Sequence, residues 1–153
     1  MDFKEKIEFI CDSMFGKLAK WLRMSGYFTI YLKSIERENF IKNININLLG
    51  NKILITKDSK ILNLNPQIFF LDKIYVEEQF EIIKEKFKLS FKDAFTICME
   101  CNYQLKPANK EENKEKIPEY VYKNFNEFNM CEKCGRIYWQ GSHYKEMKKK
   151  VEN

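Results

Sequence analysis

The sequence predicts an α/β protein, with a small parallel sheet flanked by helices and a four-cysteine zinc ribbon after it. Up to residue 89, short apolar runs alternate with segments whose apolar residues recur at helical spacing. That alternation is typical of a parallel sheet with crossover helices. After Leu89 the pattern changes to two C-x-x-C pairs among aromatic and polar residues. We therefore expect two domains, at residues 1–92 and 93–153.

Four apolar runs are predicted to be strands, and they lie at residues 8–12, 29–32, 53–56 and 68–71. The run at 53–56 is the clearest. Its nearly continuous apolar character is typical of a central parallel strand that is buried on both faces.

The first helix is predicted at residues 14–25, because Phe15, Leu18 and Leu22 recur at helical spacing and Gly26 is a suitable C′ residue. A second helix is expected to start at Ser34, as a capping residue, and to present a partial apolar face that includes Ile35. Asn45, Asn47 and residues 50–51 are expected to end it.

A short helical turn is expected near 59–63 and an amphipathic helix at 76–87. A terminal helix, capped by Ser142, is expected to end in the basic run 148–150.

Composition limits the classes of protein. Hydrophobic residues make up 44% of the chain, enough for a folded core, and the net charge is +5. No apolar run approaches the length of about 18 residues that spans a bilayer. The charged start of the chain lacks the apolar segment of a signal peptide. We expect a soluble cytoplasmic protein that does not bind membranes, and the sequence leaves its oligomeric state open.

Acidic residues follow three of the predicted strands, at Asp12, Asp58 and Asp72, while Glu36 or Glu38 begins the second helix. The carboxyl ends of parallel strands meet at one edge of a sheet, where ligands bind. Clustered carboxylates repel one another unless a cation lies between them, and Mg²⁺ or Mn²⁺ prefers such oxygen ligands. These ions support phosphodiester hydrolysis. Alternatively, an aspartate after a strand is simply a helix N-cap or turn residue.

Basic residues recur every three positions on the first predicted helix, at Lys17, Lys20 and Arg23. Such a ridge is suited to RNA phosphates, although a solvated helix face has the same pattern. Further candidates for contact with RNA are Lys57, Arg136 and His143. For His143, however, a hydrogen-bonded packing residue is favoured over a proton donor or a phosphate contact.

The two C-x-x-C pairs are Cys98 with Cys101 and Cys131 with Cys134. In an intracellular protein this arrangement favours a metal over disulfides. Four thiolates suit tetrahedral Zn²⁺ in a structural role, because the protein then fills every coordination position. The alternative, a thioredoxin-like redox motif, would need a C-x-x-C at the start of a helix. Cys11, within an apolar strand, is interpreted as a small buried hydrophobe.

Several of these motifs occur together in one family. The runs 12–23, 26–27, 55–58 and 78–79 resemble the Mut7-C ribonuclease family, a branch of the PIN-like ribonucleases, as do Cys98-x-x-Cys101-Asn102 and the run 131–143. The resemblance spans about residues 8–147. It implies a PIN-like domain with a C-terminal zinc ribbon and metal-dependent ribonuclease activity. The first acid of the PIN pattern then matches Asp12, and its strand-end acid matches Asp58.

The sequence departs from the family pattern at one position that bears on the metal. Glu36-Arg37 stands where the family has a pair of aspartates. The helix acid implied by the resemblance falls near Glu36 to Glu38, and Asp72 matches the fourth acid only loosely.

Two functions remain. The first is a Mg²⁺- or Mn²⁺-dependent endoribonuclease, in which Asp12 and Asp58 hold the ion and Glu36 or Glu38, with Asp72, completes its ligands. The second is a non-catalytic module that binds RNA, the ribosome or another RNA–protein complex through the basic helix and the ribbon.

Overall fold

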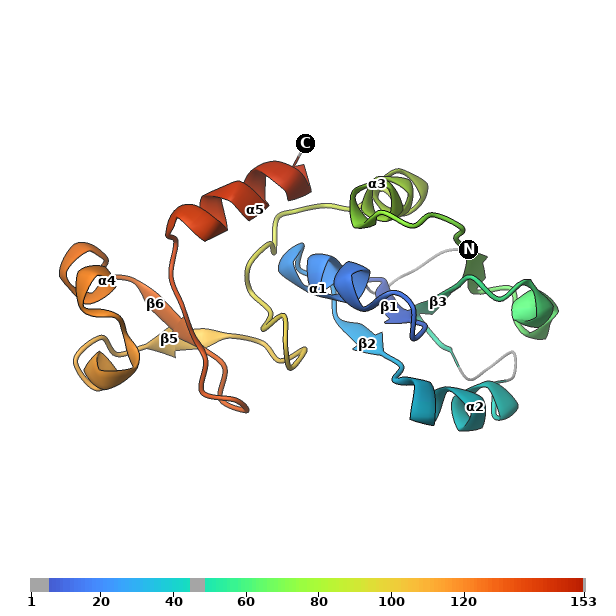
Figure 1. Cartoon of the computed structure of the whole chain (residues 1–153), viewed down its shortest axis with the longest axis horizontal. Coiled ribbons are helices and arrows are strands. Elements are labelled where there is room, and N and C mark those ends of the chain that lie inside the picture. Colours follow the sequence, from blue (N-terminus) through green and yellow to red (C-terminus); the bar gives the residue numbers. More distant parts are fainter. Residues whose placement is uncertain (1–5, 45–48, 153) are drawn as a thin grey trace.

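The computed structural model describes residues 6–44 and 49–152. Two sheets lie at opposite ends of the molecule, a parallel one built from the N-terminal half and an antiparallel one from the C-terminal half (Figure 1). None of the helices in the described ranges is long and apolar enough to cross a membrane. The predicted end of the second helix at Asn45 and Asn47 falls outside the described residues.

The N-terminal part contains strands β1 to β4, helices α1 to α3 and one 3₁₀ helix, η1. In chain order these are β1 (Glu8–Cys11), α1 (Gly16–Met24), β2 (Thr29–Tyr31), α2 (Ser34–Lys42), β3 (Lys52–Thr56), η1 (Ser59–Leu64), β4 (Ile68–Phe70) and α3 (Val76–Phe87).

The C-terminal part contains β5 (Lys106–Ala108), η2 (Lys114–Lys116), α4 (Glu119–Asn124), β6 (Phe128–Met130), β7 (Ile137–Tyr138) and α5 (Ser142–Glu152). A parallel sheet flanked by helices, followed by a four-cysteine ribbon, confirms the predicted fold class.

The N-terminal sheet has the strand order β2-β1-β3-β4, with every pair parallel. From β1 the chain crosses to β2 on one side and then returns to β3 on the other. The direction of winding therefore changes between β1 and β3. Ligands of open α/β sheets bind in the crevice beyond the carboxyl ends of two such strands. Asp12 follows β1 and Asp58 belongs to the loop after β3, so both lie at this crevice.

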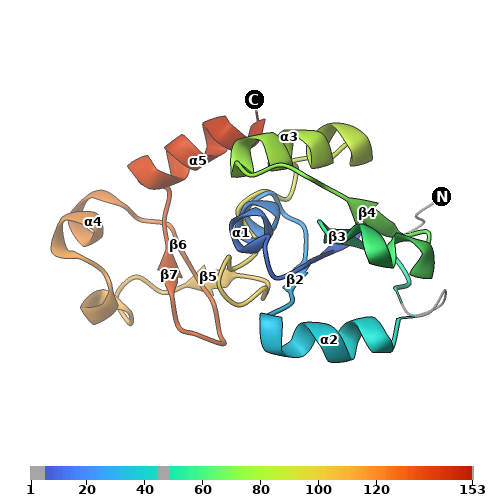
Figure 2. The ribbon, with the colours of Figure 1, turned by 45° about the vertical axis from the view of Figure 1, so that its right-hand side comes forward.

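Residues of the central strands alternate between two cores. Phe9, Cys11 and Ile55 pack with α1 and α3, while Ile10 and Leu54 pack on the opposite face with η1 and the region around α2. Figure 2 shows α1 and α3 on one side of the sheet and α2 on the other. Cys11 is fully buried, which confirms its interpretation as a core residue, and burial raises the pKa of its thiol above the usual range.

One helix start and one helix cap differ from the predictions. The first helix begins at Gly16 instead of residue 14, with Phe15 as its N-cap. Ser34 does not cap the second helix: Lys33 is the N-cap and no side chain bonds to the helix end. Ile35 is 88% exposed and so does not belong to the apolar face.

Gly26 lies just after α1, as predicted, with φ of 96°. A β-carbon there would lie 2.5 Å from the Asp93 carbonyl oxygen, so glycine permits this close approach between the N-terminal part and the segment before the ribbon.

The C-terminal sheet has the order β5-β6-β7 and is antiparallel. Ile117, Phe128 and Ile137 form its small core. Helix α5 then returns towards the N-terminal part (Figures 1 and 2), where Lys150 Nζ lies 5.8 Å from the ring centre of Trp21 on α1.

Candidate functional site

Asp12 and Asp58, from the ends of adjacent strands, point at one side chain. Arg37 Nε donates a hydrogen bond to Asp12 Oδ1 at 2.7 Å, and Arg37 Nη2 donates one to Asp58 Oδ2 at 2.9 Å. Arg37 lies on α2, the helix that follows the edge strand β2. The two carboxylates therefore share one guanidinium, and we call these three residues the acidic site.

Asp12 is held rigidly in this site. Its side chain is 0% exposed, its Oδ1 accepts a 2.8 Å hydrogen bond from the Ser13 N–H, and its Oδ2 accepts one of 2.7 Å from the Thr56 hydroxyl. The Tyr31 hydroxyl donates to the Ser13 carbonyl at 2.6 Å and fixes the loop after β1. Since Thr56 ends β3, the sheet itself orients the Asp12 carboxylate.

Asp58 has two roles at once. Its Oδ1 accepts a 3.0 Å hydrogen bond from the Lys60 N–H and so caps η1, as the simpler interpretation of a strand-end aspartate predicts. Its Oδ2 binds Arg37. The hydrogen bond from Arg37, followed by the one from Lys60, lowers the pKa of Asp58. The hydrogen bond to Asp12 is the largest cause that raises the pKa of Arg37.

The other predicted acids do not join this pair. Glu36 is exposed. Glu38 lies 3.3 Å from Lys42, and Asp72 lies 3.6 Å from Lys57. Across the described ranges, the only set of three or more Cys, His, Asp or Glu side chains close enough to share an ion is formed by the four cysteines. The predicted convergence of carboxylates thus extends to Asp12 and Asp58 alone.

The donor chemistry of this pair fits a hard divalent cation. Mg²⁺ is commonly held by one or two carboxylates, with waters filling its remaining positions. Asp12 Oδ1 and Asp58 Oδ2 are suitable oxygen donors that already face one cationic group. That group is the Arg37 guanidinium, so an ion and Arg37 would use the same two oxygens.

The predicted ridge of three cations on α1 is corrected by the structure. Lys17 and Lys20 are exposed, and Lys20 forms a 3.0 Å ion pair with Glu100. Arg23 is only 9% exposed, because its helix face packs on β2 and the first cysteine loop. Lys57 and Arg136 are exposed, as a contact with RNA requires. The side chain of His143 lies outside the part of the chain that the structure describes.

Arg23 joins the two halves of the molecule. Its Nε donates to the Thr29 carbonyl at 2.9 Å and its Nη1 to the Met99 carbonyl at 2.7 Å. The Asn102 side-chain oxygen accepts a 2.8 Å hydrogen bond from the Thr29 N–H. The first cysteine loop is thus docked on α1 and β2, the elements that follow Asp12.

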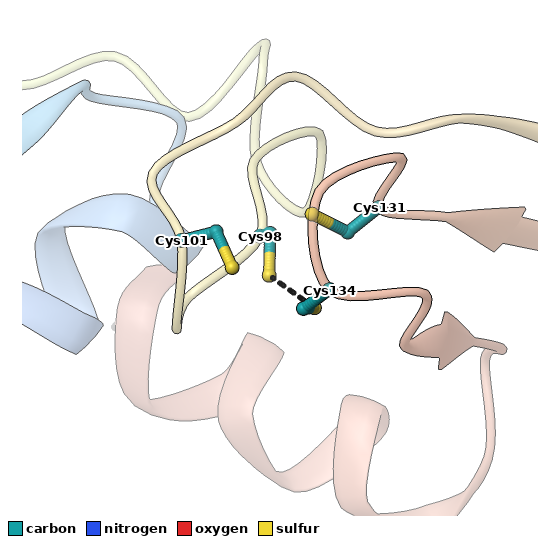
Figure 3. Close-up of side chains that lie close together, drawn as sticks. All are labelled: Cys98, Cys101, Cys131 and Cys134. Atoms are coloured by element: carbon teal, nitrogen blue, oxygen red, sulfur yellow. Dashed lines mark hydrogen bonds between the residues drawn. The ribbon is translucent and has the colours of Figure 1, made fainter.

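The four cysteine side chains point toward one another from two loops (Figure 3). Their sulfur atoms all lie within 4.8 Å of one another, and Cys98 Sγ is 3.9 Å from Cys134 Sγ. Tetrahedral zinc with bonds of about 2.3 Å would place the sulfurs about 3.8 Å apart. The Tyr138 hydroxyl lies 3.1 Å from Cys98 Sγ. This cluster can hold a zinc ion, and its geometry fits one.

The two cysteine loops have the same local hydrogen bonds. The Asn102 N–H donates to the Cys98 carbonyl at 2.9 Å, and the Gly135 N–H donates to the Cys131 carbonyl at 2.8 Å. Asn102 and Gly135 have φ of 62° and 76°, a conformation that favours these two residue types. Each C-x-x-C pair therefore forms its turn from local sequence.

A family model described as the Mut7-C RNAse domain matches residues 7–151. The chain belongs to the Mut7-C family. This finding confirms the resemblance seen in the sequence, and the match covers both the acidic site and the cysteine cluster. The family suggests a nuclease-like protein with RNA as its substrate. No curated protein and no solved structure matches the chain.

Sequence reasoning missed three residues of these Mut7-C sites: Arg37 as a partner of the acids, Thr56 as their support, and Arg23 as a link to the ribbon. The departure at Glu36-Arg37 was a signal that this position is unusual. Nothing in the sequence indicated where the guanidinium would point.

Proposed function

We propose that this Mut7-C chain is an endoribonuclease that hydrolyses RNA phosphodiester bonds at Asp12 and Asp58 with Mg²⁺ or Mn²⁺. The observation that supports the proposal is that two strand-end aspartates from β1 and β3 bind the same cationic group. Carboxylates that share a guanidinium are close enough to share a divalent ion. Such an ion would activate water and stabilise the developing charge.

The protein's own contribution is to hold the two carboxylates ready. Thr56 and the Ser13 N–H orient Asp12, and the Lys60 N–H orients Asp58. Water would complete the ligands of the ion. In this proposal Glu36, Glu38 and Asp72 are not ligands, because Glu36 is exposed and the other two pair with lysines.

RNA would approach along the same edge of the sheet. A cavity of about 520 Å³ lies between the loop after β1 and the start of α3, and its lining includes Met14, Lys17 and Tyr75. Lys17 would bind a phosphate and the exposed Tyr75 ring would stack on a base. Lys57 and Arg136 are further proposed phosphate contacts.

The proposal also assigns work to the two parts of the chain. Residues 1–92 would supply the acidic site, while residues 93–153 would form a zinc-loaded ribbon that adds a second RNA contact. The proposed location is the cytoplasm.

A second candidate is a non-catalytic module that binds RNA or the ribosome. Arg37 favours it, because a guanidinium that neutralises part of the acidic charge can replace a metal permanently. In that case Lys17 and the ribbon would bind RNA without cleaving it.

The test compares cleavage of structured and single-stranded RNA in Mn²⁺ by the wild type, D12N and D58N. The matched control is E38Q, which removes an exposed acid of α2 that lies outside the site. The proposal predicts cleavage by the wild type and E38Q, with loss in D12N and D58N. Equal cleavage by wild type and D12N would remove the assignment. Salt-sensitive RNA binding that yields no products and survives both D12N and metal chelation would support the second candidate.

A further inference from the structure

We propose that Arg37 is a built-in counter-cation that competes with the divalent ion for Asp12 and Asp58, and so sets the metal affinity of the site. The proposal rests on the metal site suggested above but not on RNA cleavage. It assigns Arg37 a positioning role, since the residue acts through the two carboxylates.

The competition follows from the atoms involved. Arg37 binds Asp12 Oδ1 and Asp58 Oδ2, one oxygen of each carboxylate. The other oxygen of each carboxylate accepts a hydrogen bond from Thr56 or from the Lys60 N–H. An ion shared by both aspartates would need the oxygens that Arg37 holds.

Charge also opposes simultaneous binding of Arg37 and a divalent ion to the two carboxylates. The aspartates carry two negative charges and Arg37 returns one positive charge, which leaves the site with a net charge of −1. A divalent ion would neutralise both carboxylates by itself. If Arg37 stayed in place, two cations would lie beside each other next to the buried Asp12 carboxylate and would repel one another.

Of the three side chains in the acidic site, Arg37 is the one that can move away when an ion binds. Asp12 is fully buried and Asp58 is tied to the main chain of η1, so neither carboxylate turns away easily. Helix α2 has no buried residue, and the Arg37 side chain is already 27% exposed. Its guanidinium can move into water without disturbing either core.

The first experiment measures Mn²⁺ binding to the zinc-loaded full chain by calorimetry. R37Q removes the competing charge, and K42Q removes a charge from the exposed side of the same helix as a matched control. R37Q is expected to bind Mn²⁺ about tenfold more tightly than wild type, because the ion no longer has to break the charge-assisted hydrogen bonds of Arg37. K42Q should bind as wild type does, and D58N should bind much more weakly. Equal affinity in R37Q and wild type would overturn the proposal.

A second experiment needs no variant and so remains decisive if R37Q does not fold. Mg²⁺ is titrated into the wild type, and the Nε–H signals of Arg37 and Arg23 are followed by NMR. Arg23 is an internal control, because its Nε–H donates to the Thr29 carbonyl and not to either acid. The Arg37 signal should shift and exchange faster with water as Mg²⁺ binds, while that of Arg23 stays unchanged. An Arg37 signal that is unaffected once the Asp58 amide shows saturation would contradict the proposal.

These readouts separate this inference from the proposed function. Tighter Mn²⁺ binding by R37Q without RNA cleavage by any variant would support the role of Arg37 and reject the nuclease. Cleavage by wild type, together with unchanged metal affinity in R37Q, would support the nuclease and reject the proposed role of Arg37.

Discussion

The cysteine cluster and the acidic site differ in what lies between their side chains. The four cysteine sulfurs face one another, with the Tyr138 hydroxyl beside one of them. In the acidic site, Arg37 lies between Asp12 and Asp58. Burial, with the neighbouring thiols, raises the pKa of Cys101 to about 12, so ionisation of Cys101 depends on a bound cation. The acidic site has a cation of its own.

Because of this difference, the two clusters should respond differently to metal. The cysteine cluster joins two loops of the ribbon, which has only a small core, so zinc should control folding there. The acidic site belongs to a sheet with two substantial cores and is already neutralised in part. Metal at that site should therefore affect activity more than folding.

The largest expected effect is that of zinc removal. Structural zinc sites can contribute about 10 kcal/mol, so chelation, or C131S, should unfold the ribbon. It should also loosen α1, because Arg23 would lose the Met99 carbonyl of the folded cysteine loop. Circular dichroism and elemental analysis measure the two effects. C11A is the control, since Cys11 lies in the other core and should leave one zinc per chain. A metal-free chain with the wild-type unfolding temperature would contradict this view.

The next effect concerns the acids themselves. D12N should destabilise the fold by about 3 kcal/mol, because Arg37 and the Thr56 hydroxyl lose a buried charged partner. D58N should cost about 1 kcal/mol, since Asp58 is partly exposed and Asn can still cap η1. Urea unfolding gives both values. If D58N cost as much as D12N, the burial of Asp12 would not be what stabilises the site.

Substitutions of Arg23 and Lys17 should separate an effect on folding stability from an effect on RNA affinity. R23M is expected to cost about 2 kcal/mol of stability, because it leaves main-chain carbonyls of β2 and the cysteine loop without their donor.

K17A should change stability by less than about 0.5 kcal/mol. It should weaken RNA binding and lower the salt dependence by about one phosphate contact. Wild-type RNA affinity in K17A would contradict the proposed phosphate contact at Lys17.

The smallest effect is a pH dependence at the contact between Lys6 and Asp93, which lie 2.8 Å apart. The hydrogen bond from Lys6 lowers the pKa of Asp93. A carboxyl whose pKa is lower when folded stabilises the fold above its unfolded pKa, about 3.9, and loses that contribution as the pH falls through the folded pKa. D93N should thus lower the unfolding temperature slightly at pH 7, and by less as the pH falls below about 3.9. A difference in unfolding temperature between wild type and D93N that grows as the pH falls would contradict this prediction.

The sequence predicted those features that depend on neighbouring residues. Each C-x-x-C pair is followed by Asn102 or Gly135, which suits its turn. Strand-end positions identified Asp12 and Asp58, because parallel strands bring their carboxyl ends to one edge. The 76–87 helix agrees with α3 residue for residue.

Features that depend on contacts with residues distant in the sequence were not predicted. Arg23 has the spacing of a surface ridge, yet the cysteine loop, distant in the sequence, covers it. Ile35 follows a helical pattern but has no core beneath it. The position of Arg37 depends on how α2 crosses the sheet, which residue spacing does not specify.

The most direct test of the account is anomalous diffraction from crystals of the zinc-loaded chain soaked in increasing Mn²⁺. We expect a manganese peak between Asp12 and Asp58 that rises only as the Arg37 guanidinium turns out into solvent, and that rises at lower Mn²⁺ in R37Q. A manganese ion bound there with both Arg37 hydrogen bonds intact would contradict the account, as would saturating Mn²⁺ with no peak at the pair.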